Sequence, residues 1–148
     1  MTEGSWQLRP AEAGDREFLY ALNEATMREH VEKVWGWNDS EQLAFFDNRF
    51  QPDEWQVIQA DGEDVGVLIV RDNDDELYLA EIEILPEWQG LGIGSAVVRS
   101  LMRDAVARQK PLTLRVLHVN GRARALYERL GFRSFKEIET HTYLRWDG

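Results

Sequence analysis

The stretch "PEWQGLGIGS", from Pro86 to Ser95, places three glycines within five residues. It follows the apolar run "LYLAEIEIL" and precedes apolar residues at helical spacing, so a strand leads through the glycines into a helix. Such a junction presents unpaired backbone N–H groups and the positive end of the helix dipole, which together suit an anion such as a phosphate group. A tight turn that binds nothing is the alternative for a glycine cluster taken alone.

The spacing of these glycines differs from that of two well-known phosphate-binding loops. The P-loop requires Gly-Lys-Ser/Thr, which the stretch lacks, and the G-x-G-x-x-G loop would need glycine in place of Ser95. The remaining pattern is Gln89-x-x-Gly92-x-Gly94. The stretch is therefore a candidate anion site of a different kind.

Two carboxylates precede the glycines in the same apolar run. Glu81 and Glu83 alternate with apolar residues on a strand that should be central to a sheet, where an unpaired carboxylate is costly. They either pair with arginines such as Arg71 on a neighbouring strand or face a ligand.

The elements that must position these residues follow from periodicity and turn residues along the chain. No repeat, low-complexity tract or linker indicates a second domain, so residues 1–148 are predicted to form a single domain. We expect strands at 5–9, 55–60, 64–72, 76–85, 112–117, 132–138 and 140–146. Pro10 onward leads into a first helix that runs to about His30, and further helices follow a cap at 38–40, run from the glycines to about Lys110, and lie within 120–132.

The length and composition of the chain limit its domain size, its chemistry and its location. At 148 residues the chain has the size of about one domain. It contains no cysteine, which excludes disulfides, Cys-based zinc sites and thiol nucleophiles, and its three scattered histidines give no metal-ligand spacing, so no metal is expected. We see no secretory signal or long apolar segment, which predicts a cytoplasmic protein that does not enter a membrane.

The net charge of −10 is unevenly distributed. Residues 1–85 hold 6 Lys and Arg against 21 Asp and Glu, whereas residues 86–133 hold 9 against 3. The acidic half would attract a cationic substrate, although it could serve solubility alone. The acidic remainder and the lack of clustered aromatic and basic strands argue against nucleic acid as a partner.

A second motif indicates a family. The segment "NGRARALYERLGF" places Tyr127 seven residues after Asn120 and ahead of Gly131-Phe132. Together with "QGLGIG", it resembles the two signatures of the GNAT superfamily of N-acetyltransferases, in that family's order. The resemblance covers essentially the full chain. It implies an α/β GNAT (acyl-CoA N-acyltransferase) fold, with a mixed central sheet of about six to seven strands flanked by about four helices.

The resemblance implies acetyl-CoA as the cosubstrate. Its pyrophosphate would lie on the backbone amides of the glycine loop, and its pantetheine arm would pair with the strand before the loop. For Asn120, a turn-forming role before Gly121 is an equal alternative. The residues that the resemblance assigns to the cofactor are Ile84, Leu85, Gln89, Gly90, Leu91, Gly92, Ile93, Gly94, Ser95, Asn120 and Tyr127.

Acetyl transfer to an amine requires a neutral nucleophile, stabilisation of the oxyanion and a proton for the departing thiolate. Tyr127 matches the family tyrosine that donates a hydrogen bond or proton to the sulfur, because a phenol with an ordinary pKa of about 10 is protonated at neutral pH; a buried core position is its alternative. Glu81 and Glu83 are candidates for deprotonating the acceptor ammonium, directly or through water. The absence of cysteine is consistent with direct attack in a ternary complex.

The region between the first two helices commonly forms part of the acceptor pocket in this family. Arg28, His30, Trp35 and Trp37 lie there, and the tryptophans of "WGW" would form a wall that contacts a cationic acceptor. Packing of both tryptophans on the sheet is the alternative. The expected acceptor is a primary amine of a small molecule or peptide, whose identity the residues do not select.

The resulting prediction is an acetyl-CoA-dependent N-acetyltransferase. The alternative is a non-catalytic acyl-CoA-binding sensor with the same fold, for which the loop would suffice and the carboxylates would be structural. The terminal strands could also pair between subunits, because members of the family are frequently dimers, and a homodimer is an open expectation.

Overall fold

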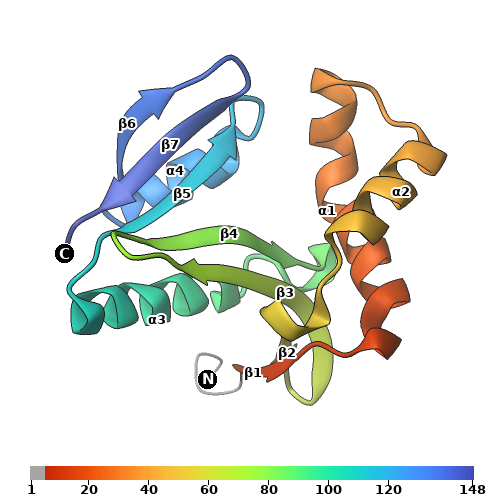
Figure 1. Cartoon of the computed structure of the whole chain (residues 1–148), viewed down its shortest axis with the longest axis horizontal. Helices are drawn as coiled ribbons and strands as arrows, with labels where there is room; N and C mark the ends of the chain where they lie inside the picture. Colours follow the sequence, from red (N-terminus) through yellow and green to blue (C-terminus); the bar gives the residue numbers. More distant parts are fainter. Residues whose placement is uncertain (1–5) are drawn as a thin grey trace. The chain divides into compact units, whose positions relative to one another are not determined.

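The computed structural model describes residues 6–148, in which seven β-strands, four α-helices and three short 3-10 helices form. The strands make one mixed sheet in the order β1-β2-β3-β4-β5-β7-β6 (Figure 1). The succession of helices and strands is the predicted one, and their numbers lie within the predicted range. Ser5, at the start of the predicted first strand, lies outside the described residues.

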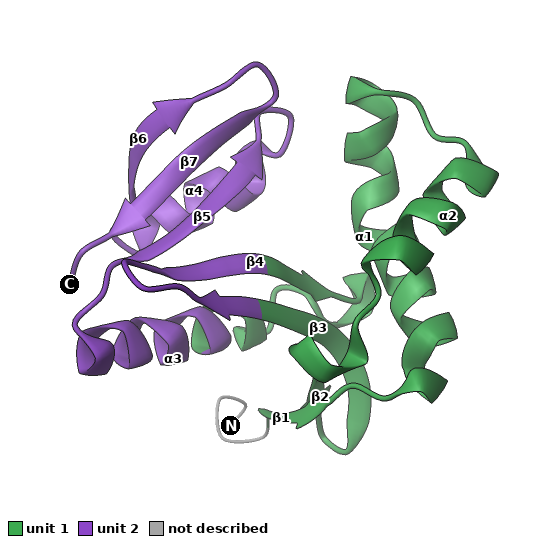
Figure 2. Ribbon diagram, in the orientation of Figure 1, with its two compact units in different colours: residues 1–69, 81–96 green, residues 70–80, 97–148 purple. Residues whose placement is uncertain are grey.

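The chain divides into two units, which are coloured separately in Figure 2. Unit 1 comprises residues up to 69 together with 81–96, and unit 2 comprises residues 70–80 and 97–148. Two strands and one helix contribute residues to both units. The expectation of a single domain stays a prediction.

Unit 1 holds most of the N-terminal half of the chain. Its helices and strands are α1 (Arg16–Val34), α2 (Asp39–Arg49), β1 (Trp6–Pro10), β2 (Trp55–Ala60), residues 63–69 of β3 (Glu63–Asp72) and residues 81–84 of β4 (Leu77–Ile84). Three 3-10 helices connect them: η2 (Ala13–Asp15), η3 (Pro52–Glu54) and η4 (Pro86–Trp88).

An aromatic cluster joins the two helices of unit 1 to strand β2. The ring of Phe46 on α2 lies edge-on to Tyr20 of α1 and to Trp55 of β2, with centroids 5.4 and 5.8 Å apart. Phe46 also stacks on Phe50. Because aromatic side chains bury large apolar areas and favour edge-on or offset contacts, this cluster fixes α1 and α2 against the sheet of unit 1.

Strand β2 pairs antiparallel with β1 on one side and with β3 on the other. Arg9 of β1 binds both Asp15 and Asp64, with nitrogen–oxygen distances of 2.8 and 2.9 Å. These hydrogen bonds from Arg9 lower the pKa of both carboxyl groups. The start of α1 and the start of β3 are thereby tied to the same edge strand.

Unit 2 contains β5 (Leu112–Leu117), α4 (Gly121–Arg129), β6 (Arg133–Glu137), β7 (His141–Trp146) and residues 97–108 of α3 (Ile93–Arg108). Strand β5 runs parallel to β4 and antiparallel to β7. Leu114 and Leu144 are partners in this register, and both are buried in the core. The predicted terminal pair is confirmed as β6 and β7, with β6 at the sheet edge; pairing of this edge between subunits stays a prediction.

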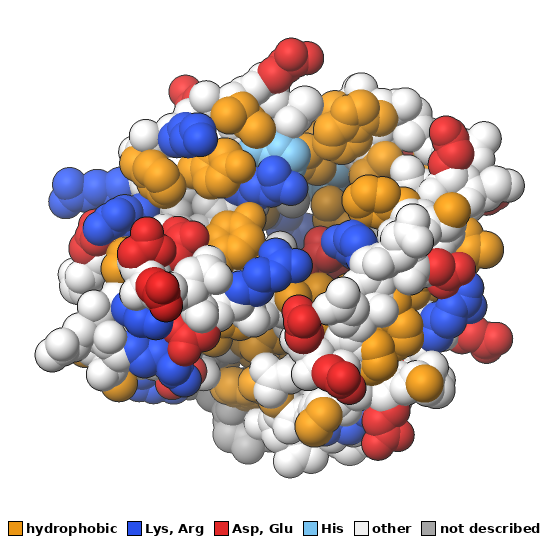
Figure 3. All heavy atoms as spheres, viewed as in Figure 1, with side chains coloured by type: hydrophobic (Ala, Val, Ile, Leu, Met, Phe, Trp, Pro, Cys, Tyr) orange, Lys and Arg blue, Asp and Glu red, His pale blue; other side chains and the backbone are white. Residues whose placement is uncertain are grey.

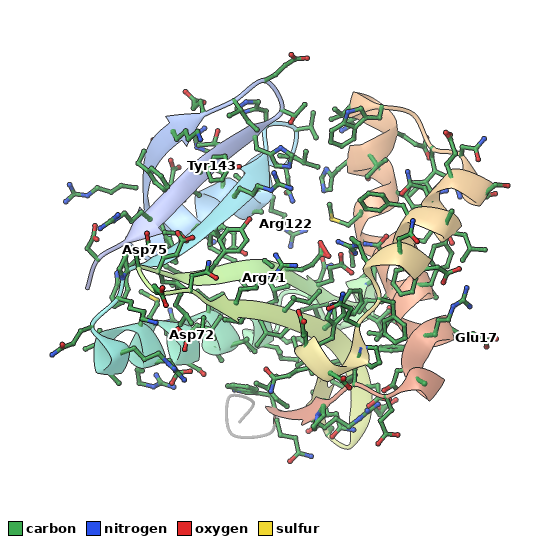
Figure 4. The ribbon with its side chains drawn as sticks, viewed as in Figure 1. Glu17, Arg71, Asp72, Asp75, Arg122 and Tyr143 are labelled. Carbon is green, nitrogen blue, oxygen red and sulfur yellow. The ribbon has the colours of Figure 1, made fainter. Side chains whose placement is uncertain are left out.

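Asp72, labelled in Figure 4, connects three parts of unit 2. Its carboxylate accepts hydrogen bonds from Arg108 in the last turn of α3 and from Lys110 before β5, each at 2.6 Å. Lys110 also donates to the carbonyl of Asn73. The hydrogen bond from Lys110 lowers the pKa of Asp72, so the end of β3 carries an anion that holds the α3–β5 connection.

Helix α1 ends at Val34, about one turn beyond the end predicted near His30. The half-buried Val31 and Val34 continue the apolar spacing. Gly36 then adopts a φ of 82°, and its N–H bonds to the carbonyls of Val31 and Glu32. A left-handed glycine of this kind closes helix ends, so the glycine of "VWGWND" is the stop signal.

The outer surface carries both signs of charge. In Figure 3, Lys and Arg side chains are interspersed with Asp and Glu across the visible face. No helix formed by residues 6–148 combines the length and apolar character that crossing a membrane requires.

Gly66 allows a close approach between β3 and β4 within unit 1. A Cβ atom at this position would overlap the carbonyl oxygen of Glu83 and would lie 3.3 Å from the Cδ1 atom of Ile58. A residue without a side chain is therefore required where β3 meets the carbonyl of Glu83.

We expect Gly66→Ala to lower the free energy of unfolding by about 1–3 kcal/mol, because the added methyl group must push β3 away from Glu83. Denaturant titration measures the change. Gly14→Ala is the matched control, since nothing lies within 4 Å of a Cβ atom there. Equal stability of the two variants would contradict the close approach.

Asn120 caps helix α4, since its side-chain oxygen accepts a hydrogen bond from the N–H of Ala123 at 3.2 Å. We expect Asn120→Ala to lower the unfolding free energy by about 1 kcal/mol, whereas Asn120→Asp, which keeps a capping oxygen, retains most of it. Thermal or chemical denaturation compares them. If both variants unfold at the same denaturant concentration, the cap does not stabilise the helix.

Candidate active site

The glycine loop after β4 has the open backbone that its sequence predicts. Gly90 and Gly92 adopt φ angles of 79° and 89°, which side chains other than hydrogen disfavour. At Gly90, Gly92 and Gly94 no atom lies within 4 Å of a Cβ position, so the loop borders open space. Leu91 is exposed, whereas Ile93 is buried and anchors the start of α3. An approaching ligand would meet backbone here.

The start of α3 leaves several N–H groups without an acceptor in the helix. The first backbone bond of the helix runs from the N–H of Ala96 to the carbonyl of Gly92. The N–H groups of Ile93, Gly94 and Ser95 precede it and cannot find helical partners. Unpaired N–H groups, the helix dipole and the open glycine backbone fit an anionic group such as a pyrophosphate.

The strand backbone just before the loop is partly engaged. The N–H of Leu85 donates to the carbonyl of Val65 at 2.8 Å, and its carbonyl accepts from Trp88. The carbonyl of Ile84 accepts a hydrogen bond from the side chain of Gln89 at 2.8 Å. Because a carbonyl can accept two bonds, Ile84 and Leu85 could still pair with a ligand, and their assignment to the cofactor stays a prediction. Gln89 ties the loop to the end of β4.

Glu83 is a buried carboxyl group one residue before Ile84, and its side chain is held by α1. The Nδ2 atom of Asn23 donates to the Oε2 atom of Glu83 at 2.9 Å, and only 5% of Glu83 is exposed. Burial, and then the charge of Glu81, raise the pKa of Glu83 well above 4.5, while hydrogen bonds from Asn23 and Thr26 and the charge of Arg49 act in the other direction. The raised pKa makes Glu83 a candidate for a group that exchanges a proton during a reaction.

Glu81 has a different environment from Glu83. Its Oε2 atom lies 3.2 Å from the Nη1 atom of Arg49, the last residue of α2. The guanidinium carbon of Arg49 is 5.5 Å from the ring centroid of Phe45 and 5.6 Å from that of Trp55. Pairing of a glutamate with an arginine, one of the two alternatives drawn from the sequence, is therefore found for Glu81. The arginine is Arg49 of α2 and not Arg71.

Asn23 and Arg49, the partners of the two glutamates, were not identified from the sequence. Asn23 and Thr26 stand three residues apart inside a helix, where both types are disfavoured, and this spacing places them on one face. That pattern is a signal that the sequence contains. The pairing of Arg49 with Glu81 has no comparable signal, because the two residues are 32 positions apart on different elements.

Tyr127 lies on α4 in unit 2, where it is buried with its ring 5.6 Å from that of Phe132 in an edge-on contact. Burial raises the pKa of its phenol to about 12. The hydroxyl group is therefore protonated at any pH at which the protein would be assayed. Both the predicted catalytic role and its alternative, a core aromatic residue, fit this environment.

Asn120 and His118 follow the end of β5, and His141 begins β7 in unit 2. Asn120 serves as the helix cap described above, which matches the turn-forming alternative; a cofactor contact stays a prediction. His118 bonds to the carbonyl of Ile138 and to the hydroxyl of Thr142. These partners make His118 part of a local network.

Residues 6–148 contain no group of three or more His, Cys, Asp or Glu side chains arranged to hold a metal ion.

Arg28 and Trp37, two of the predicted acceptor residues, contact each other. The guanidinium of Arg28 lies 5.4 Å from the ring centroid of Trp37, and it pairs with Glu24 and Glu32 on the same helix. The indole nitrogen of Trp37 donates to Asp39. Arg28 thus already occupies a cation–π contact with Trp37, and this pair stabilises the connection between α1 and α2.

His30 and Trp35 are placed differently. His30 is half-buried, and its Nδ1 atom is buried without a hydrogen-bond partner among the described residues. Trp35 is 61% exposed at the end of α1. The structure therefore does not place all four predicted acceptor residues in one contact group within unit 1, and their role in binding an acceptor stays a prediction.

Comparison with known sequences identifies the family. A model described as the acetyltransferase (GNAT) family matches residues 17–132. The chain is 36% identical over 73 residues to a thialysine N-epsilon-acetyltransferase from Bos taurus, covering 49% of this chain and 43% of the relative. It is 37% identical over 78 residues to a 5-NmdU N-acetyltransferase from Pseudomonas phage PaMx11, covering 51% and 54%. The chain spans about half the length of these curated relatives.

Solved structures show the same fold at low sequence identity. A PaiA N-acetyltransferase from Thermoplasma acidophilum, in complex with coenzyme A, superposes with a TM-score of 0.79 at 12% identity, over 97% of this chain and 99% of the other. The ribosomal-protein-S18-alanine N-acetyltransferase from Escherichia coli gives 0.68 at 21% identity, over 95% and 92%. The predicted fold class is confirmed, and with the family model matching most of its length, the chain belongs to the acetyltransferase (GNAT) family.

Proposed function

We propose that this chain is an acetyl-CoA-dependent N-acetyltransferase that acetylates a primary amine by direct attack in a ternary complex. The observation that carries the proposal is the buried carboxyl group of Glu83 near the end of β4, the strand that leads through η4 into the glycine loop. Gln89 of that loop bonds to Ile84, the residue next to Glu83. A candidate proton acceptor and a candidate anion site are therefore linked within unit 1.

The glycine loop is proposed to hold the cofactor through its backbone. Residues Gly90 to Ser95 would bind the pyrophosphate, because the glycines leave the N–H groups accessible and the start of α3 adds a favourable dipole. When bound, acetyl-CoA supplies a thioester whose carbonyl carbon an amine can attack. The coenzyme A complex of the structural neighbour is consistent with this assignment.

Glu83 is proposed to accept a proton from the acceptor ammonium, which makes the nitrogen nucleophilic. A carboxyl group with a raised pKa is suited to this step, because a better base removes the proton more readily. The nitrogen then forms a C–N bond as the C–S bond breaks. The second proton that the nitrogen loses goes to the departing sulfur, and Glu83 returns its own proton to solvent.

Tyr127 is proposed to donate a hydrogen bond to the departing sulfur. Its pKa of about 12 favours a hydrogen bond over full proton transfer. Transfer to a thiolate, whose conjugate acid has a pKa of about 8.5, would run uphill by roughly 5 kcal/mol. The phenol would thus stabilise charge on sulfur without losing its proton.

The acceptor is proposed to be cationic. Residues 1–85 carry most of the acidic side chains, which favours an ammonium-bearing acceptor over an anion. The acceptors named for similar proteins are thialysine, 5-NmdU and an alanine of a ribosomal protein. These names do not select one class of acceptor for this chain.

The test is release of thiol from acetyl-CoA in the presence of polyamines, amino acids, aminoglycosides and peptides, run beside calorimetric binding of acetyl-CoA. We expect binding and turnover with one amine class. Binding without turnover for any amine would favour the acyl-CoA sensor, and absence of binding would contradict the assignment of the loop.

We expect Tyr127→Phe to lower kcat by about 10- to 100-fold, the effect of losing one hydrogen bond to a charged atom. Stability should stay within about 0.5 kcal/mol of the wild type, because the ring is kept. Tyr143→Phe, at another tyrosine of unit 2 that is labelled in Figure 4, is the matched control. Unchanged turnover in Tyr127→Phe at saturating substrates would remove this residue from the mechanism.

The raised pKa of Glu83 also predicts how stability depends on pH. Above pH 4.5 the unfolded chain releases this proton while the folded chain keeps it, so wild-type stability falls as pH rises toward the folded pKa. Glu83→Gln lacks this loss, and its unfolding free energy relative to wild type should rise with pH above about 4.5. Denaturant titrations at several pH values measure it, with the exposed Glu87→Gln as control. A constant difference between Glu83→Gln and wild type would contradict the raised pKa.

A further inference from the structure

Two glutamates on one strand of unit 1 have partners of different kinds. Glu81 meets a permanent cation, Arg49, at 3.2 Å, whereas Glu83 meets the neutral amide of Asn23 at 2.9 Å. A guanidinium stabilises only the ionised form of a carboxyl group and would hold it as an anion. A neutral amide stabilises the ionised form of a carboxyl group far more weakly. The two carboxyl groups therefore differ in their partners: Glu81 is paired with a cation, whereas Glu83 is hydrogen-bonded to a neutral amide.

The amide of Asn23 is a suitable partner for both protonation states of Glu83. Its N–H donates to the ionised carboxylate, and after rotation of the amide its oxygen can accept from the protonated form. Asn23 also comes from α1, which the aromatic cluster around Phe46 holds against β2. The amide is therefore presented from a fixed element and orients the carboxyl group.

Resting on the function proposed above, we propose that Asn23 is the positioning residue for Glu83 in proton transfer from the acceptor, while Glu81 is paired with Arg49 and takes no part in that step. The groups that face Glu83 are Asn23 and Thr26 from α1, Glu81 from β4 and Arg49 from α2. Asn23 donates to the carboxylate at 2.9 Å, whereas the hydroxyl group of Thr26 donates to the carbonyl of Leu22 in its own helix at 3.0 Å.

The first test uses kinetics of the full chain with its best amine. Asn23→Leu, which keeps the branched shape of the side chain without its polar atoms, is expected to lower kcat about tenfold. It should also move the acidic limb of the kcat/KM profile to higher pH, because the carboxylate loses a donor. Glu81→Gln is expected to move the same limb to lower pH, because it removes a like charge. An acidic limb that stays in place in both variants would overturn the proposal.

A double-mutant cycle separates positioning from a general structural effect. In the Glu83→Gln background, Asn23→Leu should cause no further loss of kcat, because Asn23 acts through Glu83. Asn48→Leu, at an exposed position of α2, is the matched control, and in each background its kcat should equal that of the parent protein without the Asn48 substitution. Equal losses from Asn23→Leu in the two backgrounds would overturn the positioning role. If Asn23→Leu does not fold, the isosteric Asn23→Asp replaces it, with a larger shift of the acidic limb to higher pH.

A third measurement does not depend on turnover. The side-chain amide signal of Asn23 in ¹H–¹⁵N NMR spectra, identified by its absence in Asn23→Asp, should move with pH in wild type and stay constant in Glu83→Gln. A signal that is insensitive to pH in wild type would overturn the proposal. If no amine is acetylated, the proposed function fails, and this titration still decides whether Asn23 responds to the proton on Glu83.

Discussion

The site depends on one constraint, the burial of the Glu83 carboxyl group in β4 without a cation as its hydrogen-bond partner. Burial and the nearby charge of Glu81 both oppose ionisation, so the group needs a donor that stabilises it without fixing it as an anion. Asn23 supplies that donor from α1. The packing of α1 and α2 on β2 around Phe46 therefore also positions the side-chain amide of Asn23.

The second requirement is glycine at the positions near this carboxyl group where a side chain would not fit or would obstruct a ligand. Gly66 lets β3 approach the carbonyl of Glu83, where a methyl group would not fit. Gly90 and Gly92 use left-handed conformations to open the loop that follows the same strand. A short segment of β4 and its loop thus carries both the candidate proton-exchanging carboxyl group and the candidate anion site, which is why the proposed chemistry centres on it.

Much of the fold was predictable, because periodicity and turn residues are local signals. The end of α1 was predicted near His30, but the glycine that ends the helix is Gly36, so α1 continues to Val34. Glu81 and Glu83 were recognisable as costly residues, but their partners were not. Asn23 is 60 positions from Glu83, and which face of α1 meets β4 depends on tertiary packing that no local pattern encodes. The acceptor residues around "WGW" were inferred by family analogy, and the structure shows Arg28 and Trp37 already engaged with each other.

The most direct test of the account is a ¹³C NMR titration of the Glu83 side-chain carboxyl carbon in the wild-type chain, with its signal assigned from the spectrum of Glu83→Gln. The account predicts a midpoint well above the ordinary pKa of 4.5, with the direction set first by burial. A midpoint at or below 4.5 would show that Glu83 is an ordinary ionised carboxylate at neutral pH, and would contradict its role as the proton-exchanging group of the site.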